Sequence, residues 1–251
     1  MKENFEKYAL TFFAVYIFVL FFASLAKANN DTNIVRYYIE KCGDTAKQVC
    51  WCLTGQKGYQ LTYQTTDECH VTETDDSLAT LSWQMTKTSQ KFSMKSIRQE
   101  NAILIDGEDE GKIIQKHIEI DDTPWFQATS LSLRNFILSN RTEIEFLTLI
   151  PQVYDVYKMK ATKSGTEKLV IHNQTIETVR VEMKLAGILG SIWKGHYWYR
   201  ARDGAFMRFT GPANIAGTEQ MVVSFTGRET IRRTDMGLSN LKPEPRAQSL
   251  F

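Results

Sequence analysis

Four cysteines carry the most distinctive chemistry of this chain, and all of them lie between residues 33 and 70. They are Cys42, Cys50, Cys52 and Cys69. Structural zinc sites usually show ligand pairs at C-x₂₋₄-C, and redox or haem sites need C-x-x-C, but neither spacing is present. An even number of cysteines in an exported chain is typical of disulfide bonds. We therefore predict two structural disulfides and no metal site.

Four cysteines allow three pairings, and the sequence leaves the choice open. We expect a bond between Cys50 and Cys52 to be the least favoured, on the interpretation that these two side chains point to opposite sides of a strand. Cys42 would then pair with Cys50 and Cys52 with Cys69, or Cys42 with Cys52 and Cys50 with Cys69. A bond between Cys42 and Cys69 is a further option.

A second group of reactive side chains lies on one predicted strand, residues 192–200. Because side chains alternate along a strand, one face of this strand carries Trp193, Gly195, Tyr197 and Tyr199. We expect this aromatic face to form part of the core. The opposite face carries Lys194, His196, Trp198 and Arg200. We predict that this basic face binds the polar group of a ligand, with Arg208 as a neighbour and with Trp125 as a gating residue. A solvated convex face is the alternative interpretation.

Catalytic motifs are missing from the sequence. It contains no H-E-x-x-H, no G-x-S-x-G, no phosphate-binding glycine loop and no dinucleotide fingerprint. The four histidines, His70, His117, His172 and His196, lie on separate segments without metal-ligand spacing. We therefore expect no catalytic residue, no metal and no cofactor, and a protein that is not an enzyme.

The elements that position these residues are predicted to be strands. Residues 177–210 indicate three antiparallel strands, because apolar and polar side chains alternate and Asp203-Gly204 favours a tight turn. Similar alternation recurs from residue 59 to residue 120 and from residue 143 to residue 185. Parallel pairing would need crossover helices, which these short connections cannot hold. The pattern therefore predicts an antiparallel meander.

One helix is expected within this series of strands, over residues 124–138. Thr123 is a plausible N-cap, and Pro124 suits the first helical position, where its missing N–H costs nothing. Leu133, Phe136 and Ile137 share a face at helical spacing. The helix is therefore expected to pack against the sheet.

The N-terminal segment is predicted to direct export. Lys2 and Lys7 precede an apolar run from residue 8 to residue 25. After this run, Ala26-Lys27-Ala28 resembles a signal-peptidase site. We expect a signal peptide over residues 1–28 with cleavage after Ala28, and a periplasmic or secreted product. An uncleaved membrane anchor is the alternative.

Three further regions are expected after the signal peptide: a cysteine-bearing segment over residues 29–58, an antiparallel β domain over residues 59–234 and a disordered tail over residues 235–251. The chain carries a formal net charge of +1, and residues 1–28 contribute that excess. The remaining chain is formally neutral with mixed signs, which gives no electrostatic footprint for nucleic acid.

Three runs carry a resemblance to a known group of proteins. They are PWFQATSLSLRNF from residue 124, TEIEFLTLIP from residue 142 and WKGHYWYRARDGAFMRFTG from residue 193. These runs resemble a group of uncharacterised bacterial envelope proteins, which are similar in outline to the carriers of the lipoprotein-localisation system (LolA/LolB-like). The resemblance implies a mainly β fold, in which a strongly curved antiparallel sheet, or half-barrel, carries a short helix.

Such a half-barrel has a concave apolar face that one short helix cannot fill. We therefore expect a monomer of the cell envelope that binds an apolar or amphipathic ligand, such as a lipid or a lipoprotein. The alternative is a non-enzymatic structural or interaction protein with a filled core, whose sheet edges bind another envelope protein.

Overall fold

The computed structural model describes residues 32–233, except residues 56–57, 188–189, 191 and 214–218. The predicted signal peptide and the predicted tail lie outside these residues. Residues Thr32–Arg232 form one compact unit. Within the described part of the chain, no helix has the length and apolar character needed to cross a membrane.

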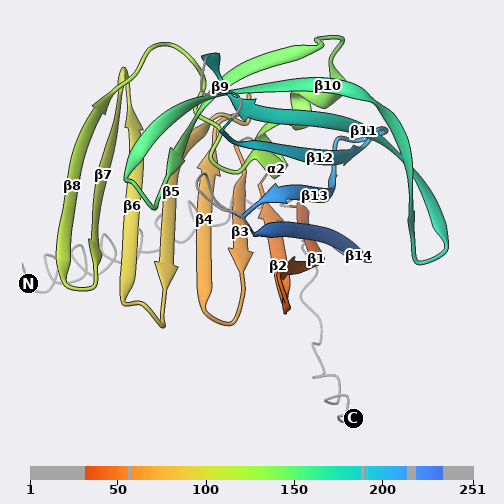
Figure 1. Cartoon of the computed structure of the whole chain (residues 1–251), viewed down its shortest axis with the longest axis horizontal. Coiled ribbons are helices and arrows are strands. Elements are labelled where there is room, and N and C mark those ends of the chain that lie inside the picture. The colour runs from red at the N-terminus through yellow and green to blue at the C-terminus, as the bar shows by residue number, and fades with distance from the viewer. Residues whose placement is uncertain (1–31, 56–57, 188–189, 191, 214–218, 234–251) are drawn as a thin grey trace, which may run out of the picture. The chain divides into compact units, whose positions relative to one another are not determined.

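Fourteen strands form one sheet (Figure 1). All neighbouring strands whose register is defined pair in antiparallel orientation. The strands are β1 (Thr32–Cys42), β2 (Thr45–Thr54), β3 (Gln60–Gln64), β4 (Glu68–Thr74), β5 (Thr80–Lys87), β6 (Phe92–Gln99), β7 (Ala102–Asp109), β8 (Lys112–Glu119), β9 (Glu143–Ile150), β10 (Asp155–Ile171), β11 (Gln174–Leu185), β12 (Lys194–Arg200), β13 (Phe206–Pro212) and β14 (Gln220–Arg233). Their order is β8 to β1 followed by β14 to β9, so two meanders meet where β1 adjoins β14. The predicted antiparallel meander is confirmed.

The cysteine-bearing segment belongs to the middle of this sheet. Strands β1 and β2 lie between β3 and β14 in the sheet order, so the segment is not an appendage ahead of the β domain. Tyr38, Val49 and Leu53 from these strands are buried. The segment therefore contributes core residues that the sequence did not indicate.

The predicted helix is present but begins later than expected. It consists of two short pieces, α2 (Thr129–Ser132) and α3 (Arg134–Leu138), and the N-cap residue is Ala128 without a side-chain cap. The expected N-cap at Thr123 and first helical position at Pro124 are therefore wrong. Leu147 N donates to Pro124 O and Phe126 N donates to Leu147 O, each at 2.8 Å. Residues 124–126 thus pair with the outer edge of β9, which satisfies backbone groups that a helix here would leave open.

Trp125 brings the two ends of the sheet together. Its side chain is fully buried in a cluster with residues from β5 to β8 and from β9, including Trp83, Ile103 and Leu149. On the other side, Thr80 N donates to Trp125 O at 2.7 Å. Strands at opposite ends of the hydrogen-bonded order therefore face one another across a shared core. This packing requires strong curvature, and the sheet is curved but not closed.

The predicted disulfides are not present, because all four cysteines are free thiols. Cys50 and Cys69 both pair with Gln64, so β3 separates them by about 10 Å, beyond the reach of a disulfide. Cys42 lies four residues after Tyr38 and shares its inward face, whereas Cys50 pairs with Tyr37 and faces outward. Register therefore keeps these thiols apart.

The interpretation of Cys50 and Cys52 as pointing to opposite sides is also wrong. Both residues lie on β2, and residues two apart on a strand share a face. Their separation along an extended strand is about 6.7 Å, at the upper limit for a disulfide. They are the closest of the outward-facing thiols, although they are not bonded.

Candidate functional site

The predicted basic face of β12 forms contacts within the chain itself. Lys194 Nζ lies 3.1 Å from Glu182 Oε2, and Trp198 Nε1 donates to Glu167 Oε2 at 2.9 Å. Burial, together with the nearby Arg180 guanidinium, lowers the pKa of His196. The register of β10, β11 and β12 brings these groups together across three neighbouring strands.

Two arginines flank Trp198 on this face. Arg180 on β11 and Arg208 on β13 lie opposite Trp198 in the strand register. Their guanidinium carbons lie 5.7 Å and 5.5 Å from the centroid of the Trp198 ring. Arg180 Nη1 also lies 3.0 Å from Glu167 Oε1. Arg208, the predicted neighbour of the site, therefore lies beside Trp198. On the same face, Arg180 and Lys194 already form ion pairs with Glu167 and Glu182.

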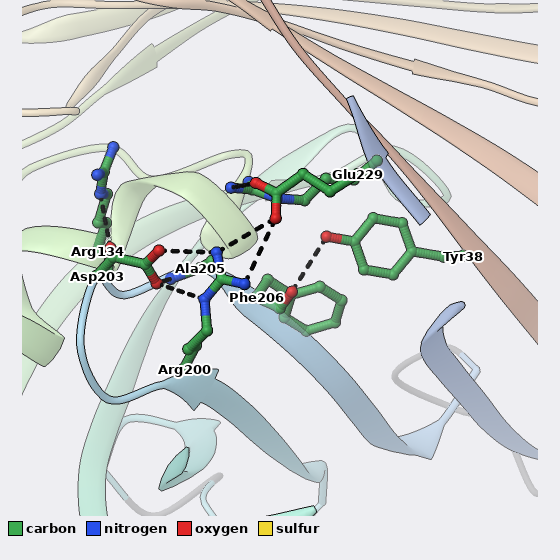
Figure 2. A network of polar contacts seen from close by, with 8 residues as sticks. Tyr38, Arg134, Arg200, Asp203, Ala205, Phe206 and Glu229 are labelled. Atoms are coloured by element: carbon green, nitrogen blue, oxygen red, sulfur yellow. Dashed lines mark hydrogen bonds and ion pairs between the residues drawn. The ribbon is translucent and has the colours of Figure 1, made fainter. Parts of the chain in front are cut away.

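Arg200 lies in a separate network that joins several elements (Figure 2). Its guanidinium donates to both carboxylate oxygens of Asp203, at 2.8 and 2.7 Å, and lies 3.4 Å from Glu229 Oε2. Arg36 Nη2 pairs with the other oxygen of Glu229 at 2.8 Å, and Arg134 Nε donates to Asp203 O at 2.9 Å. Burial alone would lower the pKa of Arg200, but the two carboxylates outweigh it and raise that pKa. Arg200 thus links β12 to β14 and to the following turn.

Trp125 also has an internal partner. Its Nε1 donates to Gln127 Oε1 at 2.9 Å. The same Gln127 amide accepts from Leu149 N at 2.9 Å and donates to Leu149 O at 3.0 Å. The side chain of Gln127 therefore pairs with the outer edge of β9 as a neighbouring strand would. Trp125 is core, whereas Gln127 and Ala128 line a cavity.

The main cavity lies on the inward face of the sheet and has a volume of about 360 Å³. Residues from β1 to β5 line one side, residues from β12 to β14 line the other, and the start of α2 contributes to the wall. Seven aromatic side chains are part of the lining: Trp51, Tyr63, Trp83, Trp193, Tyr197, Phe206 and Phe209. The inward aromatic face predicted for β12 thus meets aromatic residues from β2, β3 and β5, which lie far earlier in the chain.

A second cavity of about 200 Å³ adjoins the first. The two share five lining residues: Gln127, Thr129, Trp193, Tyr197 and Ala213. Met159 and Met183 add flexible apolar side chains to the smaller cavity. The two spaces therefore form neighbouring apolar compartments.

Two ionisable side chains line the main cavity. Glu40 and His70 both line it, and Glu40 Oε2 accepts from Tyr63 OH at 3.2 Å. Glu40 Oε1 lies 2.9 Å from Lys47 Nζ, which also lies 3.6 Å from Glu68. These contacts form a ladder of alternating charges across β1, β2 and β4.

Glu68 connects this ladder to His70. Its Oε1 lies 3.2 Å from His70 Nε2 and 3.5 Å from Lys87 Nζ. Burial alone would raise the pKa of Glu68, but His70, Lys87 and Lys47 outweigh it and hold that pKa at about 2. His70 Nε2 is buried and has no hydrogen-bond partner, although Glu68 Oε1 lies 3.2 Å away. The ladder therefore keeps a carboxylate charged beside an imidazole at the cavity.

The sequence did not indicate Trp51, Tyr63 and His70 as site residues. They pair across β2, β3 and β4 in a single inward row. Alternation identified a strand at Tyr63, but the neighbours of this strand depend on register, which a single sequence does not reveal. Within the described ranges, no group of three or more His, Cys, Asp and Glu residues is arranged to hold a metal ion.

Comparison with known proteins supports the fold. No family model matches the chain, and no curated protein matches it. A solved structure from Brucella abortus, a beta-barrel-like protein of the domain of unknown function DUF1849, aligns with a TM-score of 0.59 at 8% identity. The alignment covers 81% of this chain and 99% of that one. The two chains share a fold.

A second structure, a DUF1329 family protein from Desulfovibrio piger, aligns over 86% of this chain and 90% of that one at 10% identity. Its TM-score is only 0.28, so it adds no argument. The predicted β architecture thus agrees with a β-barrel-like protein of unknown function. The finer likeness to lipoprotein-localisation carriers stays a prediction.

Proposed function

We propose that this protein binds an apolar or amphipathic ligand in the concavity of its curved sheet. The observation that carries the proposal is the aromatic cavity of about 360 Å³ between the two halves of the sheet. Small-molecule sites usually have volumes of about 300–1,000 Å³ and mostly apolar walls with a few polar groups. Glu40 and His70 supply such polar groups.

Apolar burial supplies the binding energy in this proposal. Each CH₂ group removed from water contributes about 0.8 kcal/mol, so a chain of several methylenes offsets the cost of association. The predicted export signal favours a ligand of the cell envelope. We propose a lipid, or the acyl part of a lipoprotein, as its source.

The alternative of a structural protein with a filled core requires that the inward face be occupied by the protein's own side chains. A cavity of about 360 Å³ on that face favours ligand binding instead. Native mass spectrometry of the protein purified from its exporting host would identify a bound lipid by its mass.

A cavity-filling substitution tests the proposal. Val223 lies on β14, lines the cavity and is 8% exposed, whereas Val170 on β10 is 72% exposed. We expect Val223→Trp to weaken binding of the neutral fluorescent probe N-phenyl-1-naphthylamine at least about tenfold, because the indole occupies the ligand's volume. Val170→Trp, the same exchange on an exposed position, should leave binding unchanged.

Circular dichroism would verify that both variants are folded. A folded Val223→Trp protein with unchanged affinity, or a wild-type protein that binds no apolar probe, would refute the proposed function.

A further inference from the structure

The charges around the main cavity are unevenly placed. Among the described lining residues, Glu40 is the only side chain with a permanent charge, and no lysine or arginine is part of the wall. Lys47 and Lys87 are not among the lining residues, although they lie on the same face of the sheet as Glu40 and Glu68, with which they pair. A buried anion without a paired cation is unfavourable. The wall therefore disfavours a ligand whose anionic group enters the cavity.

Aromatic rings favour the opposite charge. The face of an aromatic ring carries negative potential and attracts cations within about 6 Å of its centre. Trp51, Tyr63 and Trp83 stand on the same side of the cavity as Glu40, and other rings face them from β12 and β13. A carboxylate beside several aromatic rings is complementary to an ammonium group.

We propose that the ligand of this cavity carries a positively charged amine, protonated or quaternary, at its polar end, with Glu40 as the counter-charge. This inference rests on the proposed binding of an amphiphile and specifies its class. The apolar part of the ligand lies among the aromatic side chains, and the amine lies beside Glu40 and His70.

Lys47 competes with the ligand for Glu40. Its Nζ lies 2.9 Å from Glu40 Oε1, and its side chain is 43% exposed, whereas that of Glu40 is 13% exposed. Removal of Lys47 leaves the Glu40 carboxylate with the Tyr63 hydroxyl as its remaining partner at 3.2 Å. Loss of Glu40 and loss of Lys47 must therefore change the affinity for a cation in opposite directions. A merely structural role of the pair would weaken binding in both variants.

Displacement of N-phenyl-1-naphthylamine by three amphiphiles of equal chain length tests the inference. Decyltrimethylammonium, decyl sulfate and decanol would each be used below the concentration at which they aggregate. We expect the ammonium compound to bind about tenfold more tightly than the sulfate. Glu40→Gln should reduce this ratio to below about threefold, and Lys47→Gln should increase it by a similar factor.

Glu108→Gln is the matched control, because Glu108 lies on β7 at an exposed position away from the cavity. It should leave the ratio unchanged. Equal affinities, a preference for the sulfate, or a ratio unaffected by Glu40→Gln in a folded protein would overturn the inference. Failure of all apolar compounds to bind would instead refute the proposed function itself. If Glu40→Gln does not fold, Lys47→Gln decides, and an unchanged or weaker affinity for the ammonium compound overturns the inference.

Discussion

At the scale of single residues, Arg200 of the predicted site is paired within the chain. Arg200, Asp203 and Glu229 satisfy one another between β12 and β14. Each charge has an opposite charge within hydrogen-bonding or ion-pair distance, which offsets the cost of its burial. A basic side chain on a strand therefore does not by itself indicate a ligand site.

Replacement of Arg200 tests this structural role. Arg200→Met should lower the free energy of unfolding by about 2–4 kcal/mol, because the Asp203 carboxylate loses its two-point partner while it stays half-buried. Arg202→Met, an exposed position two residues later, should change it by less than about 0.5 kcal/mol. Urea unfolding followed by circular dichroism measures both. Equal effects of the two substitutions would contradict the network's importance.

Glu68 predicts a dependence of stability on pH. Its pKa is about 2 in the folded protein, below the ordinary value of 4.5, so its contribution is fully present above about pH 4.5. The contribution is lost as the pH falls from about 4.5 toward 2, and its upper bound is about 3 kcal/mol. Unfolding free energies measured across this range should fall less steeply in Glu68→Gln. An identical slope in both proteins would show that Glu68 does not contribute.

At the scale of elements, the segment before α2 controls the exposed edge of β9. Residues 124–126 pair with Leu147 through the backbone, and the Gln127 side chain continues the pairing at Leu149. An open strand edge can recruit other chains, so this cover protects the end of the sheet. The same segment positions Gln127 at the cavity.

Gln127→Leu tests whether the Gln127 side chain protects the edge of β9. The substitution removes the partner of the Trp125 indole and both side-chain bonds to the Leu149 backbone. We expect a loss of about 2–3 kcal/mol in stability and faster hydrogen exchange at the Leu149 amide. Gln115→Leu makes the same change on the exposed face of β8 and should leave this amide protected. Unchanged exchange at Leu149 in Gln127→Leu would refute the edge-cover role.

The strand register also predicts the state of the thiols. Cys50 and Cys69 lie two strands apart, and Cys42 faces inward while Cys50 faces outward. Thiol titration of the denatured protein without reductant should therefore find four reactive thiols. Two or fewer would show that disulfides form despite this register, and peptide mapping would identify their partners.

At the scale of the whole described unit, curvature makes the site. The lining combines Trp51 and Tyr63 from one meander with Tyr197 and Phe209 from the other. Strands β1 and β14 separate these residues in the sheet order, and the curvature of the sheet turns their inward faces toward one another. The cavity is thus a property of how the two meanders are arranged, and no single strand contains it.

The sequence by itself determined the local structure. Alternation of apolar and polar residues fixed most strands, and the Asp203-Gly204 turn fixed the hairpin from β12 to β13, because strand period and turn geometry are encoded by neighbouring residues. The sequence also predicted a helix within residues 124–138, although not its first residue. Residues 124–126 pair with the edge of β9 instead of forming a helical turn, and this pairing depends on a strand that comes later in the chain.

Only the tertiary structure decided which faces and thiols meet. The cysteine segment became central strands, the predicted basic face acquired partners from β10, β11 and β14, and the row of Trp51, Tyr63 and His70 turned toward the cavity. Register and curvature depend on contacts between residues far apart in sequence, and a shift of one residue would reverse every face. Those long-range contacts are what a single sequence does not contain.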